Sequence, residues 1–223
     1  MNQNGGFFGS IPVVTKNLII INVLCWFTQF ILMNKGIDIS KIMGLHFFLS
    51  DNFMPHQLIT YMFMHDPNGF AHVFFNMFAV FMFGRTLEMV WGPKRFLFYY
   101  MFTGIGAGLV QEIVWAVELW DYLSLPEIAT LQFVTVGASG AVFGILLAFG
   151  MLFPNAQLFI IPFPFPIKAK YFVIGYGLLE LFMGFANREG DSVAHFAHLG
   201  GLLFGLILIL YWRKTNNSSG RIH

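Results

Sequence analysis

Long runs of apolar residues, separated by short polar segments, cover most of this 223-residue chain. An α-helix needs roughly 20 mostly apolar residues to cross a bilayer, and six of the runs approach that length. The pattern predicts an all-α, polytopic membrane protein, a bundle of six transmembrane helices with no separate soluble domain. The expected helices lie at about residues 17–33, 70–90, 96–117, 133–152, 171–185 and 192–211.

The segments between these runs predict how the helices are connected. Residues 35–68 mix charged and apolar side chains, which is typical of an external loop with interfacial helices. Residues 162–166 read Pro-Phe-Pro-Phe-Pro, which cannot be helix interior, so we expect them to connect the fourth and fifth helices. The first run lacks the cleavage pattern of a removable signal peptide, so we expect it to remain as a helix.

Composition agrees with a surface that faces lipid. The chain is 57% hydrophobic and 10% charged, whereas soluble domains have about 25% charged residues. A net charge of +1 provides no field for binding a nucleic acid, so the expected partners are apolar, as the lipid bilayer is. Cys25 is the single cysteine, which excludes an intrachain disulfide, and no metal-ligand spacing recurs among the histidines. We therefore expect no metal and no cofactor.

The distribution of lysine and arginine predicts the orientation. Nine of them fall on one face of the expected topology: Lys16, Arg85, Lys94, Arg95, Lys168, Lys170, Arg213, Lys214 and Arg221. Three fall on the other: Lys35, Lys41 and Arg188. Because cytoplasmic loops carry the excess of positive charge, both termini are expected in the cytoplasm.

Three expected helices, the second, fourth and sixth, run inward from the external side and carry polar residues inside the apolar run. Asn76, Ser139 and His198 each lie seven or eight residues past the polar residue that opens the helix, or about 10–12 Å at 1.5 Å per residue. His72 precedes Asn76 by one turn, so the two side chains share a face. The spacing predicts that the three helices bring these residues together at one depth.

Small residues predict close packing of the fourth and sixth helices. Gly140 and Gly144 lie at helical spacing in the fourth helix, and Gly201 and Gly205 do so in the sixth. Such stripes let two helix backbones approach closely. A serine on one helix could then reach a histidine on the other, giving a nucleophile with its base, while an asparagine and a second histidine could donate to an oxyanion.

Each of these polar residues has an ordinary explanation when taken singly. A serine in a glycine-rich stripe is usually a packing residue, and a lone histidine or asparagine in a membrane helix usually forms an interhelical hydrogen bond. The coincidence of a nucleophile, a base and donors on three helices favours a functional site, because ionisable residues inside a membrane are expensive.

Three motifs carry a resemblance to a known family. Residues 137–144, Gly-Ala-Ser-Gly-Ala-Val-Phe-Gly, resemble the Gly-x-Ser-Gly helix of rhomboid proteases. His72 and Asn76 match the family's His-x-x-x-Asn, and His198 followed by Leu-Gly-Gly matches its last helix. The likeness extends over about residues 52–212.

The resemblance implies an intramembrane serine endopeptidase that hydrolyses peptide bonds in or near transmembrane segments of membrane-protein substrates. Ser139 would be the nucleophile and His198 the general base of a catalytic dyad. Asn76, His72 and the backbone N–H of Ser139 would hold the oxyanion. The supporting residues would be Gly137, Gly140, Phe143, His195, Gly201 and Gly205, with Phe143 packed against the catalytic histidine.

The other polar residues receive ordinary interpretations. Glu112 and Glu180 are interpreted as pore-facing or interfacial glutamates, and His65 as a loop or interface residue. His195 is expected near the external mouth. The Trp-Arg pair that many bacterial members carry in the first external loop is absent, with His56 and Gln57 near its place, which puts the anchoring of that loop in question.

Two alternatives remain open, a proteolytically inactive relative that binds membrane clients and a small transporter or proton channel. If the chain is a protease, substrate would approach beside the fifth helix, where Phe182 and Met183 would be displaceable apolar contacts. The expected location is a bacterial inner membrane, with the active site opening to the external side.

Overall fold

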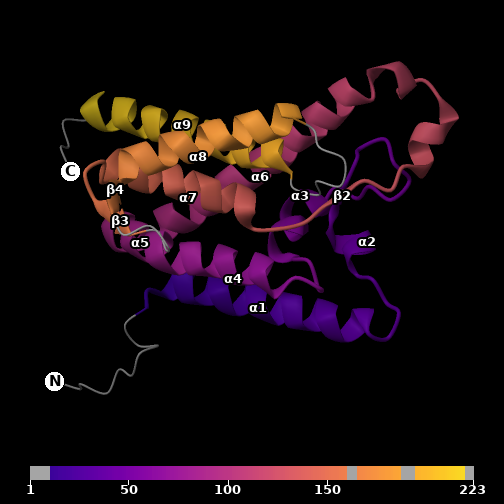
Figure 1. The fold of residues 1–223 in the computed structure, drawn as a ribbon, viewed down its shortest axis with the longest axis horizontal. Coiled ribbons are helices and arrows are strands. Elements are labelled where there is room, and N and C mark those ends of the chain that lie inside the picture. The colour runs from indigo at the N-terminus through magenta and orange to yellow at the C-terminus, as the bar shows by residue number, and fades with distance from the viewer. Residues whose placement is uncertain (1–10, 160–164, 187–193, 219–223) are drawn as a thin grey trace.

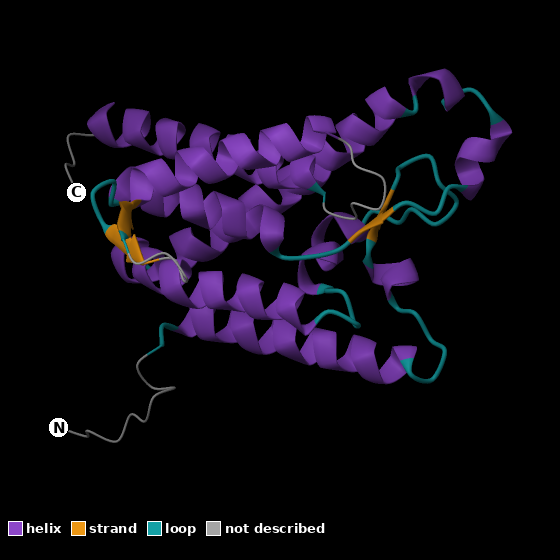
Figure 2. Ribbon diagram, in the orientation of Figure 1, coloured by secondary structure: helices purple, strands orange, loops and turns teal. Residues whose placement is uncertain are grey.

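Helices dominate the computed structural model, which describes residues 11–159, 165–186 and 194–218 (Figure 2). The longer helices are α1 (Val13–Met33), α4 (Phe70–Ala79), α5 (Arg85–Trp91), α6 (Pro93–Glu118), α7 (Ser139–Leu152), α8 (Ala169–Ala186) and α9 (His195–Ser218). The short ones are α2 (Ser40–Met43), α3 (Gln57–Thr60), η2 (Tyr61–Phe63), η4 (Trp120–Tyr122) and η5 (Pro126–Thr130). A π-helical turn, η3 (Val80–Gly84), joins α4 to α5.

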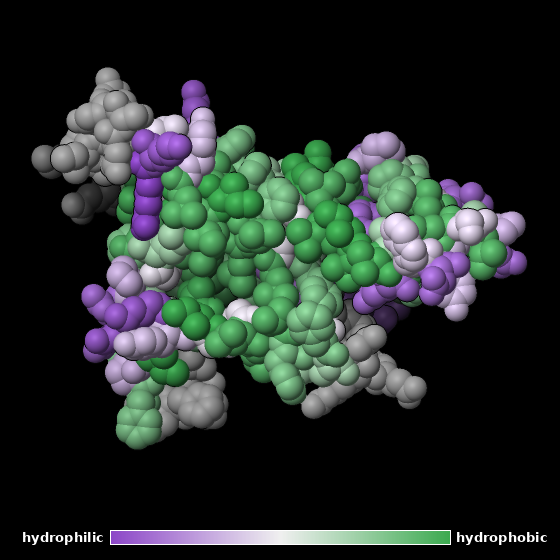
Figure 3. Space-filling view, turned by 90° about the horizontal axis from the view of Figure 1, so that it is seen from above, coloured by the Kyte–Doolittle hydropathy of each residue, from purple (hydrophilic) through white to green (hydrophobic). Residues whose placement is uncertain are grey.

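The helices form a polytopic membrane bundle, which confirms the predicted fold class. Within the described ranges, five helical segments are long and apolar enough to span a bilayer: Val13–Met33, Phe70–Trp91, Pro93–Glu118, Ala169–Ala186 and His195–Thr215. A further apolar helix, α7, has 14 residues. Figure 3 shows the corresponding apolar band over the helices, with hydrophilic residues at its two ends. Helix α1 begins and α9 ends on the same side of the bundle (Figure 1).

Two local sequence features define the tight turn between α5 and α6. Gly92 has a φ of 79°, a conformation that a side chain disfavours, and it follows the last residue of α5. Pro93 then opens α6, where its fixed φ and missing N–H suit the first helical position. The chain therefore reverses without a loop, and α6 starts three residues earlier than expected.

The expected helix at 133–152 is wrong at its start. Val134–Thr135 forms strand β2, which pairs antiparallel with β1 (Leu45–His46). Consecutive β-branched residues favour extended backbone, and Gly137 has a φ of 133°, so the helix begins only at Ser139.

This start invalidates the depth calculation for Ser139. The seven residues before it are not helical, so counting 1.5 Å per residue from Gln132 does not apply. Ser139 is the first residue of a 14-residue helix of about 21 Å, which is shorter than the hydrocarbon core of roughly 30 Å. The short helix, preceded by extended chain, takes the place of the long helix that the apolar run predicted.

The connection between α7 and α8 is not helical in its described part, as the prolines predicted. Strands β3 (Gln157–Phe159) and β4 (Pro166–Lys168) form an antiparallel hairpin. The middle of the proline run, residues 160–164, lies outside the described residues. So do Arg188, Asp191, Arg221 and the expected start of the sixth helix at residue 192.

Glycines allow α7 to lie close to α9, as the sequence predicted, and also to α6. Gly140 and Gly144 face α6, where added Cβ atoms would collide with Ala107 and with Thr103. Gly201 of α9 lies directly on the backbone carbonyl of Gly140. The close approach of α7 and α9 therefore depends on the glycine of α9.

The loop between α1 and α4 is anchored by residues that stand where a Trp-Arg pair was missing. Gln57 is fully buried; its Oε1 accepts the N–H groups of His46 and Met54, and its Nε2 donates to the carbonyls of Ile42 and Asn52. These four hydrogen bonds tie together a segment that has little regular structure. Gln57 therefore anchors this loop without a Trp-Arg pair.

A carboxylate from each of two helices fastens other segments to the bundle. Glu112 of α6 accepts the N–H of Phe48 at 2.9 Å, which holds the loop between α1 and α4. Glu88 of α5 accepts the backbone N–H groups of Val14 and Thr15 at 2.9 and 2.7 Å, and the Thr15 hydroxyl at 2.7 Å. The first amides of a helix have no acceptor within it, so Glu88 caps α1 from a distant part of the chain.

Candidate active site

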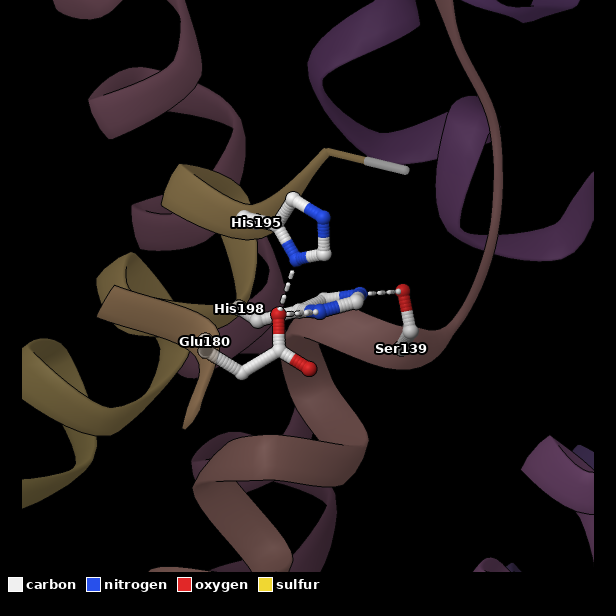
Figure 4. Close-up of polar contacts among 4 residues, drawn as sticks. All are labelled: Ser139, Glu180, His195 and His198. Atoms are coloured by element: carbon white, nitrogen blue, oxygen red, sulfur yellow. Dashed lines mark hydrogen bonds and ion pairs between the residues drawn. The ribbon is translucent and has the colours of Figure 1, made fainter. Parts of the chain in front are cut away.

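Ser139 and His198 meet where α7 and α9 begin. The Oγ of Ser139 and the Nε2 of His198 are 2.7 Å apart (Figure 4). Ser139 opens α7, and the backbone N–H of His198 donates to the Ala194 carbonyl in the first turn of α9. The ring of Phe143, one turn along α7, stacks on the His198 ring with centroids 4.4 Å apart and an interplanar angle of 11°.

A third side chain, Glu180 of α8, lies on the other side of His198. Its Oε2 accepts a hydrogen bond from His198 Nδ1 at 2.9 Å and from His195 Nδ1 at 2.6 Å (Figure 4). Glu180 is buried, so its interpretation as a pore-facing or interfacial glutamate is wrong. The three side chains place a carboxylate, an imidazole and a hydroxyl in line.

His72 approaches the serine from α4. Its Nδ1 lies 3.4 Å from the backbone N–H of Asp66, which occupies Nδ1 as an acceptor and leaves Nε2 to carry the proton of a neutral ring. A Cβ added to Gly137 would lie 2.9 Å from His72 Nε2 and 3.5 Å from Ser139 Oγ. The missing side chain of Gly137 therefore leaves a space between a ring nitrogen and the serine hydroxyl.

Asn76 lies one turn after His72 on the same helix. Its side chain is buried, and its Nδ2 has no hydrogen-bond partner among the residues that the structure describes. Buried polar groups are nearly always bonded, so an amide donor without an acceptor calls for an explanation. The N–H of Ser139, as the first of α7, likewise has no acceptor within its helix, and the helix dipole favours negative charge there.

His65 lies in the loop between η2 and α4, as the sequence predicted, and its side chain contacts His72. It is fully buried, and its ring meets the His72 ring edge-on with centroids 5.0 Å apart. Burial, with the nearby His72 ring as a smaller cause, lowers the pKa of His65 to about 3. His65 is therefore neutral at physiological pH and adds no charge beside His72.

The cluster on α8 and α9 also has the composition of a metal site. Glu180, His195 and His198 offer ligand atoms that all lie within 4.8 Å of one another. The two Nδ1 to Oε2 hydrogen bonds account for this arrangement without an ion. The absence of a metal stays a prediction.

Comparison with known proteins identifies the family. The model of the Rhomboid domain matches residues 52–215. The chain belongs to the rhomboid family. The match includes all three motifs, and with them Ser139, His198 and Glu180.

Curated relatives of this rhomboid come from several kinds of organism. It is 31% identical over 195 residues to Rhomboid protein 1, mitochondrial, of Saccharomyces cerevisiae, covering 86% of this chain and 48% of that protein. It is 29% identical over 207 residues to Rhomboid-like protein 11, chloroplastic, of Arabidopsis thaliana, covering 85% and 66%. It is 31% identical over 156 residues to Putative rhomboid protease YdcA of Bacillus subtilis, covering 69% and 67%.

The matches cover only part of the length of these relatives. The chain spans about half the length of the yeast relative and 66% of the Arabidopsis one. Two of the names place relatives in mitochondria and chloroplasts, and a third relative comes from a bacterium. The apolar helices and the family place this chain in a membrane, and these names do not indicate which one.

Sequence reasoning missed Glu180 and His65 in this rhomboid. An unpaired glutamate in an otherwise apolar membrane helix costs free energy, so the sequence alone could have indicated that Glu180 has a polar partner. Its partner could not be found from spacing, because residues 15 and 18 positions away on another helix have no periodic relation to it. His65 precedes α4, and it is buried in the folded structure, where its ring contacts His72 and its N–H donates to Gln29.

Proposed function

We propose that this rhomboid is an intramembrane serine endopeptidase that hydrolyses peptide bonds in or near transmembrane segments of other membrane proteins. The observation that carries the proposal is the 2.7 Å contact between Ser139 Oγ and His198 Nε2. A hydroxyl within hydrogen-bond reach of an imidazole, with a third group orienting that imidazole, is the arrangement of an activated nucleophile. The names of some relatives, such as Putative rhomboid protease YdcA, support the same class of activity.

In the proposed mechanism, Ser139 Oγ attacks the scissile carbonyl carbon while its proton passes to His198 Nε2. The resulting oxyanion accepts hydrogen bonds from His72 Nε2, Asn76 Nδ2 and the Ser139 N–H, in the space beside Gly137. His198 then donates its proton to the leaving amine as the carbon–nitrogen bond breaks. Water, deprotonated by His198, hydrolyses the acyl-enzyme and restores the serine.

Substrate would approach beside α8. Of the described residues in this helix, only Ala169, Val173 and Glu180 are buried, and Phe182 presents a largely exposed ring. Met183 is half-buried. The apolar side chains of Phe182 and Met183 could then be displaced by a transmembrane segment on its way to the serine, while the buried Glu180 keeps α8 in place beside α9.

The charge distribution supports a topology with both termini in the cytoplasm. With six crossings, the site then opens to the external side. A bacterial inner membrane fits this topology, as does an organelle membrane of equivalent orientation. A C-terminal reporter that is active only outside the cytoplasm should then stay silent, and a strong external signal would contradict this topology.

The transporter alternative is disfavoured by the residues below Ser139. Helix α7 continues with Val142, Phe143, Ile145 and Leu146, all buried, so the described part of this helix offers no polar relay toward the other side. An inactive client-binding relative would have no need of the hydrogen bond between serine and histidine together with an unpartnered Asn76 amide.

The proposed function is tested by incubating the purified protein, in detergent or liposomes, with a model transmembrane substrate. Cleavage by the wild type and none by Ser139→Ala is the expected result. Equal cleavage by both proteins would assign the activity to a contaminant, and no cleavage of a panel of transmembrane substrates by the folded wild type would favour the client-binding alternative.

Replacement of Asn76 by alanine is expected to slow cleavage with little change in substrate affinity. An oxyanion donor acts mainly in the transition state, and loss of one such donor lowers the rate by about 10²–10³-fold, or less where neighbouring donors share the load. Single-turnover rates at saturating substrate measure the effect. A rate equal to that of the wild type would remove Asn76 from the mechanism.

A further inference from the structure

We propose that Glu180 is a positioning residue that extends the Ser139–His198 pair to a triad, and that His195 holds Glu180 in place. The inference rests on the proposed function, because it concerns the same site. It begins from the two hydrogen bonds that converge on one oxygen, Glu180 Oε2, from His198 at 2.9 Å and from His195 at 2.6 Å.

The protons on these groups follow from what each atom can do. An ionised carboxylate only accepts, so the Nδ1 atoms of both histidines must carry protons. A neutral imidazole has one proton, and with that proton on Nδ1 the Nε2 of His198 has a free lone pair. This lone pair faces Ser139 Oγ at 2.7 Å, so Glu180 selects the tautomer in which His198 can act as a base.

Glu180 also matches the charge that develops during the reaction. When His198 takes the serine proton it becomes an imidazolium, whose Nδ1–H already points at a carboxylate 2.9 Å away. The pair is buried, where an interaction between opposite charges is stronger than in water. Phe143 covers one face of the ring and limits its rotation, so the carboxylate and the aromatic ring together hold His198 in a single orientation.

His195 has a different part, because it contacts the carboxylate and not the serine. Its Nδ1 donates to the same oxygen as His198, and its ring lies at 90° to the His198 ring with centroids 6.3 Å apart. Two donors from successive turns of α9 fix where Oε2 lies. A glutamate side chain has several rotatable bonds, so a second donor reduces the number of positions that the carboxylate can adopt.

The first test replaces Glu180 by glutamine, which keeps the shape and removes the charge. We expect the single-turnover cleavage rate and the rate of Ser139 labelling by a fluorophosphonate to fall by about 10²–10⁴-fold, while KM changes little. The matched control is Glu112→Gln, the same substitution at a buried glutamate of α6 that holds a loop. That variant should keep a rate close to the wild type, and both variants are compared at equal folded fraction by thermal unfolding.

The second test uses His195. An asparagine side chain can place its amide nitrogen near the Nδ1 position and donate to Glu180, whereas leucine cannot. We expect His195→Asn to cleave about 10-fold faster than His195→Leu. Equal rates for the two variants would mean that the hydrogen bond from His195 has no effect on the reaction.

A spectroscopic measurement does not depend on protease activity. In protein with ¹⁵N-labelled histidine, His198 should show a protonated Nδ1 and an unprotonated Nε2 in the wild type. A wild-type His198 protonated on Nε2 would overturn the inference. All measurements contain a chelator, so that a metal held by the same three side chains cannot explain a loss of rate.

The outcomes separate the two proposals. If Ser139→Ala still cleaves, the proposed function fails. Suppose instead that Ser139→Ala is inactive but the cleavage rate of Glu180→Gln stays within about threefold of the wild-type rate. Such a change is too small for a loss of transition-state stabilisation, so only the role of Glu180 would be refuted.

Discussion

Alanine in place of His198 is expected to abolish the labelling of Ser139 by a fluorophosphonate probe. The serine hydroxyl is a weak nucleophile until a base removes its proton, and His198 Nε2 is the ring nitrogen that contacts it, at 2.7 Å. Removal of the nucleophile or its base in serine proteases typically lowers turnover by about 10⁴-fold or more. Labelling is followed by fluorescence in a gel, with Ser139→Ala as the unlabelled reference.

The matched variant is His195→Ala, which changes a histidine one turn earlier on the same helix. His195 contacts Glu180 and not the serine, so labelling should be slower than in the wild type but still detectable. The opposite pattern, with labelling that survives the loss of His198 and disappears with the loss of His195, would show that the base is His195, one turn earlier in α9.

Alanine at position 201 is expected to destabilise the protein and inactivate it. The added methyl group would collide with the backbone carbonyl of Gly140, which cannot move as a side chain can. Overpacking of this kind costs about 1–3 kcal/mol, and more where backbones must separate. Helix α9 would have to move away from α7, and His198, one turn earlier, would move away from Ser139.

Thermal unfolding in detergent and the cleavage rate measure this effect. Gly175→Ala in α8 is the control, because no atom lies within 4 Å of a Cβ built there, and its melting temperature should stay equal or rise slightly. If Gly201→Ala melts and cleaves as the wild type does, the close contact between α7 and α9 is not needed for the site.

The amino-acid sequence was sufficient to predict which residues of the helices would meet, but not where the helices start. Ser139, His198 and Phe143 come together as their motifs suggested. The reason given, equal helical depth, was wrong for Ser139, because hydropathy does not distinguish a buried extended segment from a helix. The extended pairing of Val134 with His46 depends on a strand almost ninety residues earlier, and no local pattern reveals it.

Tertiary contacts also explain the residues that were misjudged. Glu180 has no motif, and its meaning comes only from two histidines on the neighbouring helix. Gln57 was noted because a Trp-Arg pair was missing nearby, yet its role depends on four backbone groups brought to it by the folded loop. In both cases a buried polar side chain has found its partners far along the chain, where periodicity gives no information.

The cap on α1 sets an order of events during synthesis. The acceptor for the first amide groups of α1 is Glu88, which lies 73 residues after Thr15 along the chain. At roughly 5–20 residues per second, about 4–15 s pass between synthesis of the first turn of α1 and synthesis of the carboxylate that caps it. Throughout that interval α1 is without this hydrogen-bonded cap, so α1 can be fastened to α5 only well after α1 itself has been made.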